Sequence, residues 1–443
     1  MKLSRYNSLI AYKGKYLLFN AFTKKVIFIE PLLKELLESA AHYGVSELAE
    51  VHPQFYEYLC KHNFIIADEI DELALLKEKV YRIDNNNTQF ELTINPTMNC
   101  NFKCWYCYET HIKTSRLNQE GIQKIQKFIQ RTLEEMPSLT NFTISFFGGE
   151  PLLYFEQEVT PIIRYAYQIT QAKNVQLNLH FTTNGYLINE KLIEFFKELN
   201  LFPTFQITLD GNETEHDKVR YINKQKGTYR KITENIKSLA QAGFNVIVRI
   251  NYTEKNLISV KEIPADFADV LNDEFRKNLH FSLHRVWQDK KPSQLVDNEL
   301  PKVLERIRTE GFVAMEQGAI DSVENSCYAD KRYSAVINYN GDVYKCTARD
   351  FTPENRVGYL TATGEIFWEN NHLEQRMNVK FHNPPCLSCR IQPLCNGGCS
   401  QQAIENWGMD YCVHQGDERE KDKVVLQHVE QILLSKNLVL ATS

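Results

Sequence analysis

Long apolar runs are missing from this sequence of 443 residues. Because a membrane-spanning helix needs about eighteen or more consecutive apolar residues, none is expected here. The first residues also lack a cationic segment followed by an apolar one, which argues against a secretory signal. No lipidation motif is present, so a lipid anchor is not expected. The sequence therefore predicts a cytoplasmic protein with no membrane partner, whose cysteines are reduced rather than paired in disulfides.

A surplus of basic charge is missing as well. The formal net charge is −5, and the charged residues, 24% of the chain, carry both signs without an extended basic stripe. No nucleic-acid partner is therefore expected. Low-complexity tracts and repeats are also absent, while 43% hydrophobic and 12% aromatic residues predict a large folded core. The length is typical of about three domains.

Cysteine, by contrast, is plentiful. The chain has eleven cysteines, and Cys100, Cys104 and Cys107 form a C-x3-C-x2-C pattern with Tyr106 before the last of them. A cubane 4Fe-4S cluster needs four ligands, so three thiolates on one loop leave one iron open to a small molecule. The alternative is a zinc site closed by His111, but zinc sites generally combine two such knuckles, and no second one follows nearby.

Strands and helices alternate on both sides of this loop. The run 90–95 reads as a strand, 118–135 as a helix and 141–147 as a further strand. The later strands are expected near 176–182, 204–210, 244–251 and 278–284, and the later helices near 155–172, 188–198, 228–241, 257–271 and 296–317. This alternation predicts an α/β fold with a parallel sheet wrapped by helices. Six strands are too few to close an eight-stranded barrel, so an open, partial (β/α)6 barrel is expected.

Several strand ends carry candidate binding residues. Gly148 and Gly149 end one apolar strand, where the missing side chains would let a ligand approach the backbone, and Glu150 follows with a carboxylate suited to an ammonium group. Thr183 and Asn184 end the next strand. For each of these positions a capped turn is the alternative interpretation.

The cysteine loop with Tyr106, followed by Gly-Gly-Glu-Pro at the next strand end, resembles the signature of the radical SAM enzymes. The resemblance implies a 4Fe-4S cluster on the three cysteines, with S-adenosylmethionine bound to the open iron. One electron then cleaves S-adenosylmethionine to a radical that abstracts hydrogen from carbon. The cofactor-binding residues implied are Tyr106, Gly148, Gly149, Glu150, Thr183, Asn184 and Arg249.

A second cysteine group lies in the C-terminal region. It comprises Cys327, Cys346, Cys386, Cys389, Cys395, Cys399 and Cys412. In a reduced compartment such a group indicates metal binding. The spacing, with Gly341 between the first two, resembles the SPASM domain, which holds two auxiliary 4Fe-4S clusters. The resemblance assigns Cys386, Cys389, Cys395 and Cys412 to the outer cluster, and Cys327, Cys346 and Cys399 to the inner one.

The inner cluster is therefore one cysteine short. Asp321, His414 or water could close it, or a cysteine of the substrate could. Sulfatase-maturing relatives have an additional cysteine near Asp321, and an aspartate where this chain has Thr347, so the chain departs from that subfamily twice. Cys60, the remaining cysteine, is expected to be an ordinary buried thiol.

The first eighty residues read as a separate module. Strands are expected at 17–19 and 26–29, and helices from Pro31, from an N-cap at Ser46 to residue 50, and over 55–61. This winged-helix-like order resembles the leader-recognition domain of enzymes that modify ribosomally made peptides. In such domains the leader peptide adds as a strand to the sheet edge, here 26–29.

Together these patterns predict three domains: a leader-recognition domain with its linker at 1–83, the radical SAM partial barrel at 84–318, and a SPASM Fe-S domain at 319–443. The expected function is a radical SAM peptide maturase that installs a crosslink, most simply a cysteine thioether, in a ribosomal precursor peptide. It would use three 4Fe-4S clusters, S-adenosylmethionine and a flavodoxin- or ferredoxin-type electron donor. The alternatives are carbon-carbon crosslinking or epimerisation, then sulfatase maturation, and remotely a noncatalytic zinc- and peptide-binding protein.

Overall fold

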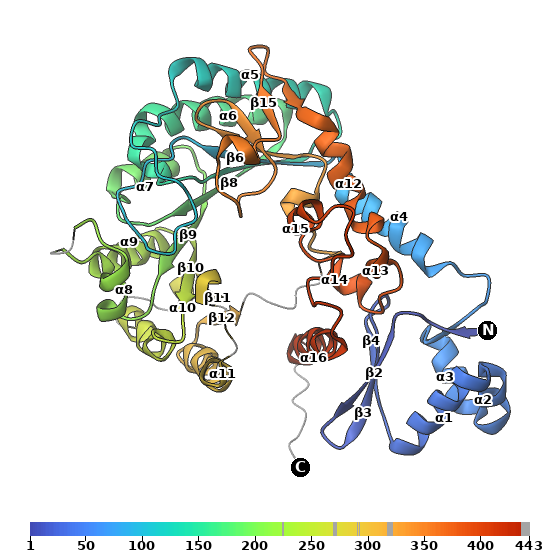
Figure 1. Cartoon of the computed structure of the whole chain (residues 1–443). Helices are drawn as coiled ribbons and strands as arrows, with labels where there is room; N and C mark the ends of the chain where they lie inside the picture. The colour runs from blue at the N-terminus through green and yellow to red at the C-terminus, as the bar shows by residue number, and fades with distance from the viewer. Residues whose placement is uncertain (224–225, 269–272, 290, 292, 317–321, 436–443) are drawn as a thin grey trace. The chain divides into compact units, whose positions relative to one another are not determined.

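The computed structural model in Figure 1 describes residues 1–223, 226–268, 273–289, 291, 293–316 and 322–435. The chain splits into two compact units, each built from segments far apart in the sequence. One unit comprises residues 1–86, 318–332 and 371–443, and the other residues 87–317 and 333–370. The domain limits expected from the sequence, at 83 and 318, stay predictions.

A large, open sheet organises the second unit. In spatial order its strands are β12 (Val313–Glu316), β11 (Leu279–Arg285), β10 (Asn245–Tyr252), β9 (Thr204–Leu209), β8 (Gln176–Thr183), β7 (Asn141–Phe146), β6 (Gln89–Asn95), β13 (Ser334–Asn338), β14 (Asp342–Tyr344), β15 (Gly358–Leu360) and β16 (Ile366–Trp368). The pairs from β12 to β13 are parallel, and those from β13 to β16 are antiparallel. The predicted open, parallel α/β sheet is confirmed.

The connecting helices are α5 (Gln119–Glu135), α6 (Thr160–Lys173), α7 (Glu190–Glu198), α8 (Glu213–Val219), α9 (Tyr229–Gln241), α10 (Asp273–Arg276) and α11 (Gln294–Thr309). Figure 1 shows α5, α6, α7 and α9 on the outer side of the curved sheet. In α5 the residues Ile122, Ile125, Ile129 and Leu133 recur at helical spacing and are buried in the core, which explains why this segment is a helix against the sheet.

Three expectations in this unit need correction. The segment expected to be helical near 296–317 ends its helix at Thr309, because Gly311 has a φ of +85° that stops the helix, and the chain continues as strand β12. The segment expected to be helical near 257–271 is a 3-10 helix over Leu257–Phe267 with Pro264 inside it, and residues 269–271 of that expectation lie outside the described residues. The segment near 155–172 begins with a π-helical turn, Phe155–Val159, before α6.

The N-terminal part of the first unit contains a three-stranded antiparallel sheet in the order β2 (Asn7–Tyr12), β3 (Lys15–Asn20) and β4 (Lys25–Ile29). Helices α1 (Pro31–Tyr43), α2 (Val45–Val51) and α3 (Pro53–Lys61) follow, in the predicted order. Helix α2 begins at Val45 rather than after an N-cap at Ser46, because Gly44, with a φ of +112°, serves as the junction between α1 and α2. A short pair, β1 (Lys2–Leu3) with β5 (Ile65–Ile66), was not predicted.

Two hydrophobic cores meet at this small sheet. One contains Leu18 and Ile29 with residues of α1, α2 and α3. Cys60, expected to be buried, is half-buried and packs at the border of this core. The other contains Leu17 and Phe19 together with residues of α4 (Glu72–Asp84), α16 (Glu418–Ser435) and the C-terminal cysteine region. The N-terminal sheet is therefore part of the same folded core as the segments that carry the outer cysteine group.

The rest of the first unit is mostly short helices. They are α12 (His372–His382), α13 (Pro384–Leu387), α14 (Gln392–Cys395) and α15 (Ser400–Glu405). Within the described part of the chain, no helix is both long enough and apolar enough to cross a bilayer.

Candidate active site

The predicted cysteine loop follows β6, at the edge where the parallel strands end. The backbone N–H of Phe102 donates to Cys100 Sγ at 3.4 Å, and the N–H of Cys107 donates to the carbonyl of Cys104 at 3.1 Å. Burial raises the pKa of Cys100 to about 12 and that of Cys107 to about 11. The free thiols therefore stay protonated at neutral pH, and a metal would have to displace their protons on binding.

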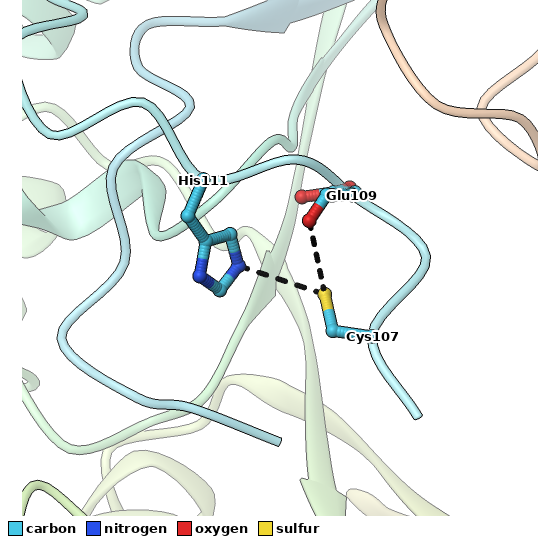
Figure 2. Close-up of side chains that lie close together, drawn as sticks. All are labelled: Cys107, Glu109 and His111. Carbon is cyan, nitrogen blue, oxygen red and sulfur yellow. Dashed lines mark hydrogen bonds between the residues drawn. The ribbon is translucent and has the colours of Figure 1, made fainter. Parts of the chain in front are cut away.

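One thiol of this loop lies beside other possible metal ligands. Figure 2 shows Cys107 between His111 and Glu109. Cys107 Sγ is 3.6 Å from His111 Nε2 and 3.9 Å from the carbonyl of Glu109. Cys107, Glu109 and His111 place ligand atoms within 4.8 Å of one another, a group that includes neither Cys100 nor Cys104. Sulfurs on one zinc ion lie about 3.8 Å apart, given Zn–S bonds near 2.3 Å. Cys100, Cys104 and Cys107 do not form a group with all their sulfurs within 4.8 Å, so they are not placed as three ligands of one zinc ion.

The glycine pair after β7 packs against the cysteine loop. The N–H of Gly149 donates to the Thr97 carbonyl at 3.1 Å, and the N–H of Glu150 donates to the Asn99 carbonyl at 2.9 Å. A Cβ at Gly148 would lie 2.6 Å from the Thr97 carbonyl oxygen, and one at Gly149 would overlap the Asn99 carbonyl. Glycine is therefore required at both positions, because the backbone of Thr97 and Asn99 occupies the space that a side chain would need.

Glu150 joins two strand ends. Its carboxylate, fully buried, accepts hydrogen bonds from the N–H of Leu152 at 3.0 Å, the hydroxyl of Thr183 at 2.7 Å and the N–H of Asn184 at 2.8 Å. Burial raises its pKa, and these three donors oppose that shift. The side chain of Asn184 in turn donates to Asn101 in the cysteine loop at 2.7 Å. The predicted residues Glu150, Thr183 and Asn184 thus form one network.

Tyr106 lies in a charged cluster that sequence reasoning did not find. Its hydroxyl donates to Asp210 at 2.6 Å and accepts from Arg220 at 2.9 Å and from Asn251 at 3.3 Å. The predicted residue Arg249 is half-buried and donates to Asn251 at 2.9 Å. The only sign of this cluster in the sequence was that Asp210 follows a predicted strand. No role was predicted for Asp210 or for Arg220.

Several buried polar atoms around the loop have no hydrogen-bond partner among the described residues. They are Oδ1 and Nδ2 of Asn95, Nδ2 of Asn101, Oδ1 of Asp210 and Nε of Arg220. Unpaired polar atoms are costly inside a protein, so they mark a place where a polar ligand would be stabilised. The amino, carboxylate and ribose groups of S-adenosylmethionine fit this donor and acceptor set.

The segment after β14 docks on the cysteine loop. The hydroxyl of Tyr108 donates to the carbonyl of Thr347 at 2.6 Å, and the N–H of Thr110 donates to Asp350 at 2.8 Å. Cys346 precedes Thr347, so this predicted ligand of the inner auxiliary cluster lies on a segment that contacts the loop. Thr347 takes part in this contact through its backbone carbonyl. It stands at the position where an aspartate was expected for a sulfatase maturase.

The four predicted ligands of the outer auxiliary cluster, Cys386, Cys389, Cys395 and Cys412, lie in the same unit of the chain and influence one another's charge. Burial raises the pKa of Cys395 to about 12, and the neighbouring Cys386, Cys389 and Cys412 raise it further. The side chain of Asn383 donates to Cys386 Sγ at 3.1 Å. His414 Nε2 lies 3.7 Å from Cys395 Sγ, so this histidine belongs to the outer group.

Two further cysteines of the first unit, Cys327 and Cys399, are exposed and both precede a helix. Cys327 is the N-cap of the 3-10 helix Tyr328–Asp330, and Cys399 is the N-cap of α15. The hydroxyl of Ser400 donates to Asp330 and joins the two helix starts. Asp321, considered as a fourth ligand, lies outside the described residues. An inner cluster shared by Cys327, Cys346 and Cys399 stays a prediction.

A buried ionic network supports these two cysteines. Lys380 of α12, with 4% of its side chain exposed, is 2.6 Å from Asp84 and 3.1 Å from Asp330. The hydroxyl of Ser326, next to Cys327, donates to Asp84 at 2.5 Å. Burial raises the pKa of Asp84, while Lys380 opposes that shift.

Lys380→Met is expected to destabilise the chain by about 3–5 kcal/mol, because it leaves two buried carboxylates without their cation. Chemical denaturation measures this loss. Lys423→Met serves as the control, since Lys423 pairs with Glu420 on the surface and its loss should cost less than about 0.5 kcal/mol. Equal stability of Lys380→Met and the parent chain would contradict the prediction.

Comparison with known proteins agrees with this geometry. The model of the radical SAM superfamily matches residues 94–258, from the end of β6 through the start of the Leu257–Phe267 helix. Residues 94–258 are a radical SAM domain. It includes the cysteine loop, the Gly-Gly-Glu segment and the Asp210 cluster, so the chain is a radical SAM enzyme, and the family implies a 4Fe-4S cluster with S-adenosylmethionine.

Relatives extend the similarity beyond the radical SAM domain. A cysteine-type anaerobic sulfatase-maturating enzyme of Clostridium novyi is 27% identical over 70% of this chain and 87% of its own length. The radical SAM cyclopropyl synthase TigE of Paramaledivibacter caminithermalis is 23% identical over 85% and 82%. Streptococcus suis SuiB, solved with its precursor peptide SuiA, has a TM-score of 0.55 at 17% identity and covers 93% of this chain and 98% of its own. This last likeness shows the fold.

Proposed function

We propose that this radical SAM enzyme is a peptide maturase that modifies a ribosomally made precursor. The observation that carries the proposal is the combination, in one chain, of the radical SAM domain, the second cysteine group Cys386, Cys389, Cys395 and Cys412, and an N-terminal three-stranded sheet with β4 at its edge. The similarity to peptide-modifying enzymes over most of the chain supports it.

The residues of this chain have distinct parts in the proposed reaction. Cys100, Cys104 and Cys107 would hold the cluster, which with S-adenosylmethionine would supply the radical that abstracts hydrogen from carbon. Glu150 fixes Thr183 and Asn184 at the strand ends, where they would bind polar groups of the nucleotide. The outer group, Cys386, Cys389, Cys395 and Cys412, would hold an auxiliary cluster, and Cys327, Cys346 and Cys399 would hold another. Auxiliary clusters of this kind would accept the electron that leaves the substrate as the new bond forms, and a flavodoxin- or ferredoxin-type protein would supply the first electron.

The proposed product is a cysteine thioether. Its support is the shortage of one cysteine among the ligands of the inner cluster, together with Thr347 in place of an aspartate. The test is anaerobic incubation of the reconstituted enzyme with a cysteine-containing precursor encoded beside its gene. Mass spectrometry should show a loss of two hydrogens and no free thiol. Equal crosslinking of a Cys→Ser precursor would favour carbon-carbon bond formation instead, and a colourless protein with zinc and no iron would refute the enzyme altogether.

We further propose that β4 binds the leader of the precursor as an added strand. This strand is at the edge of its sheet, and Phe28 on it is 36% exposed. Edge strands present unpaired backbone groups that another chain can pair with. Because the sheet shares a core with α16 and the outer cysteine region, deletion of the module would also expose that core. Substitutions in β4 therefore test the proposal better than truncation.

Proline in β4 is expected to weaken leader binding at least about tenfold, since it removes a backbone donor from the edge. Successive N–H groups of an edge strand alternate between the paired and the free side, so Ile27→Pro and Phe28→Pro are compared. The variant that keeps the parent's thermal stability should lose binding in a fluorescence anisotropy assay with labelled leader. Tyr43→Ala, at an exposed position of α1, is the control. Unchanged affinity in both proline variants would refute the edge as the binding site.

A further inference from the structure

Arg220 is a buried cation that contacts the cysteine loop on both sides of Cys104. Its Nη1 donates to the hydroxyl of Tyr106, two residues after Cys104, at 2.9 Å. Its guanidinium carbon lies 5.6 Å from the ring centroid of Phe102, two residues before Cys104. Arg220 is 7% exposed, so little solvent screens its charge.

Asp210 places an opposite charge at the same tyrosine. Its Oδ2 accepts the hydrogen bond of the Tyr106 hydroxyl at 2.6 Å, and the residue is 1% exposed. Its backbone is fixed on both sides, because its N–H donates to His216 at 3.2 Å and its carbonyl accepts from Asn256 at 3.1 Å. Burial raises the pKa of Asp210 to about 6, so the carboxylate is ionised in mildly alkaline solution.

Both charged groups reach the cysteine loop through Tyr106, and Arg220 also lies over the ring of Phe102. A cation beside a metal centre favours added negative charge on that centre, and an anion opposes it.

We propose that Arg220 and Asp210 form a positioning pair that sets the reduction potential of the cluster at Cys100, Cys104 and Cys107. The inference rests on the cluster proposed above. Reduction adds one electron to the cluster, so the neighbouring guanidinium stabilises the reduced form and raises the potential, whereas the carboxylate stabilises the oxidised form and lowers it. Tyr106 holds both charged groups against the loop through its single hydroxyl.

The test is a redox titration of the reconstituted full chain at about pH 8, with dithionite as the one-electron donor and paramagnetic resonance as the readout. Arg220→Met should lower the ratio of reduced to oxidised cluster at a fixed potential about tenfold, which is about 59 mV for a one-electron couple. Asp210→Asn should raise that ratio, and Arg220→Lys should stay close to the parent chain. Opposite shifts distinguish a charge effect from general loosening of the loop, which would move both variants the same way.

Arg230→Met is the matched control, because Arg230 is an exposed arginine paired with Glu213 and its loss should leave the potential unchanged. If the parent chain binds no iron at the cysteine loop, the proposed cluster is refuted. If the cluster forms but Arg220→Met and Asp210→Asn leave its potential unchanged or shift it in the same direction, this inference is overturned. If Arg220→Met does not fold, the rise expected for Asp210→Asn decides alone.

Discussion

Replacement of Cys100, Cys104 and Cys107 together by alanine is expected to remove about four of about twelve irons per chain and to abolish cleavage of S-adenosylmethionine. In the proposed assignment the loop supplies every cysteine of its cluster, and the outer cysteine group belongs to the other unit of the chain. The auxiliary clusters should therefore survive and keep the protein coloured. Iron analysis after anaerobic reconstitution and chromatography of 5'-deoxyadenosine measure the two effects.

The control for this experiment is Cys60→Ala, since Cys60 packs at the border of the N-terminal core and is not one of the predicted cluster ligands. It should keep the full iron content and the full rate of cleavage. Loss of all colour in the triple variant would show that the three sites do not assemble independently. Persistence of cofactor cleavage would place the reactive cluster elsewhere.

Gly149→Ala is expected to reduce cofactor cleavage at least about hundredfold, because active-site displacements of about 1 Å can have that effect. A Cβ at this position would overlap the carbonyl of Asn99, directly before Cys100. The cysteine loop would have to move away from β7 and give up the hydrogen bonds of Gly149 with Thr97 and of Glu150 with Asn99. Initial rates of 5'-deoxyadenosine formation and the iron content of the loop site measure the effect.

Gly121→Ala provides a matched glycine control. Gly121 lies in helix α5, where the added Cβ would meet the end of the flexible Leu117 side chain, and alanine favours a helix. This variant should have parent-like rates and stability. A Gly149→Ala enzyme as active as Gly121→Ala would show that the loop does not depend on the close backbone contact.

The order of the main secondary structure elements follows from the sequence because it depends on local spacing, and the prediction of the cluster ligands depends on local spacing as well. Three thiols on one short loop can hold the same cluster whatever surrounds them. The alternating pattern of strand β8 and the helical pattern of α5 can each be recognised within a short stretch of sequence. Such patterns do not show where one helix stops and a strand begins. Gly311 changed one predicted helix because a single residue can override the surrounding period.

Only the tertiary structure decided how the site is built. The sequence predicted that Gly148 and Gly149 leave room for a ligand, whereas the folded chain uses that room for the backbone of Thr97 and Asn99. Tyr106 meets Asp210 and Arg220 across 104 and 114 residues, a separation at which sequence spacing carries no information on distance. Buried charges are stable only beside their partners, and folding alone brings such partners together. The sequence by itself therefore determined the chemistry of the cysteine loop, and the tertiary structure determined the charges around it.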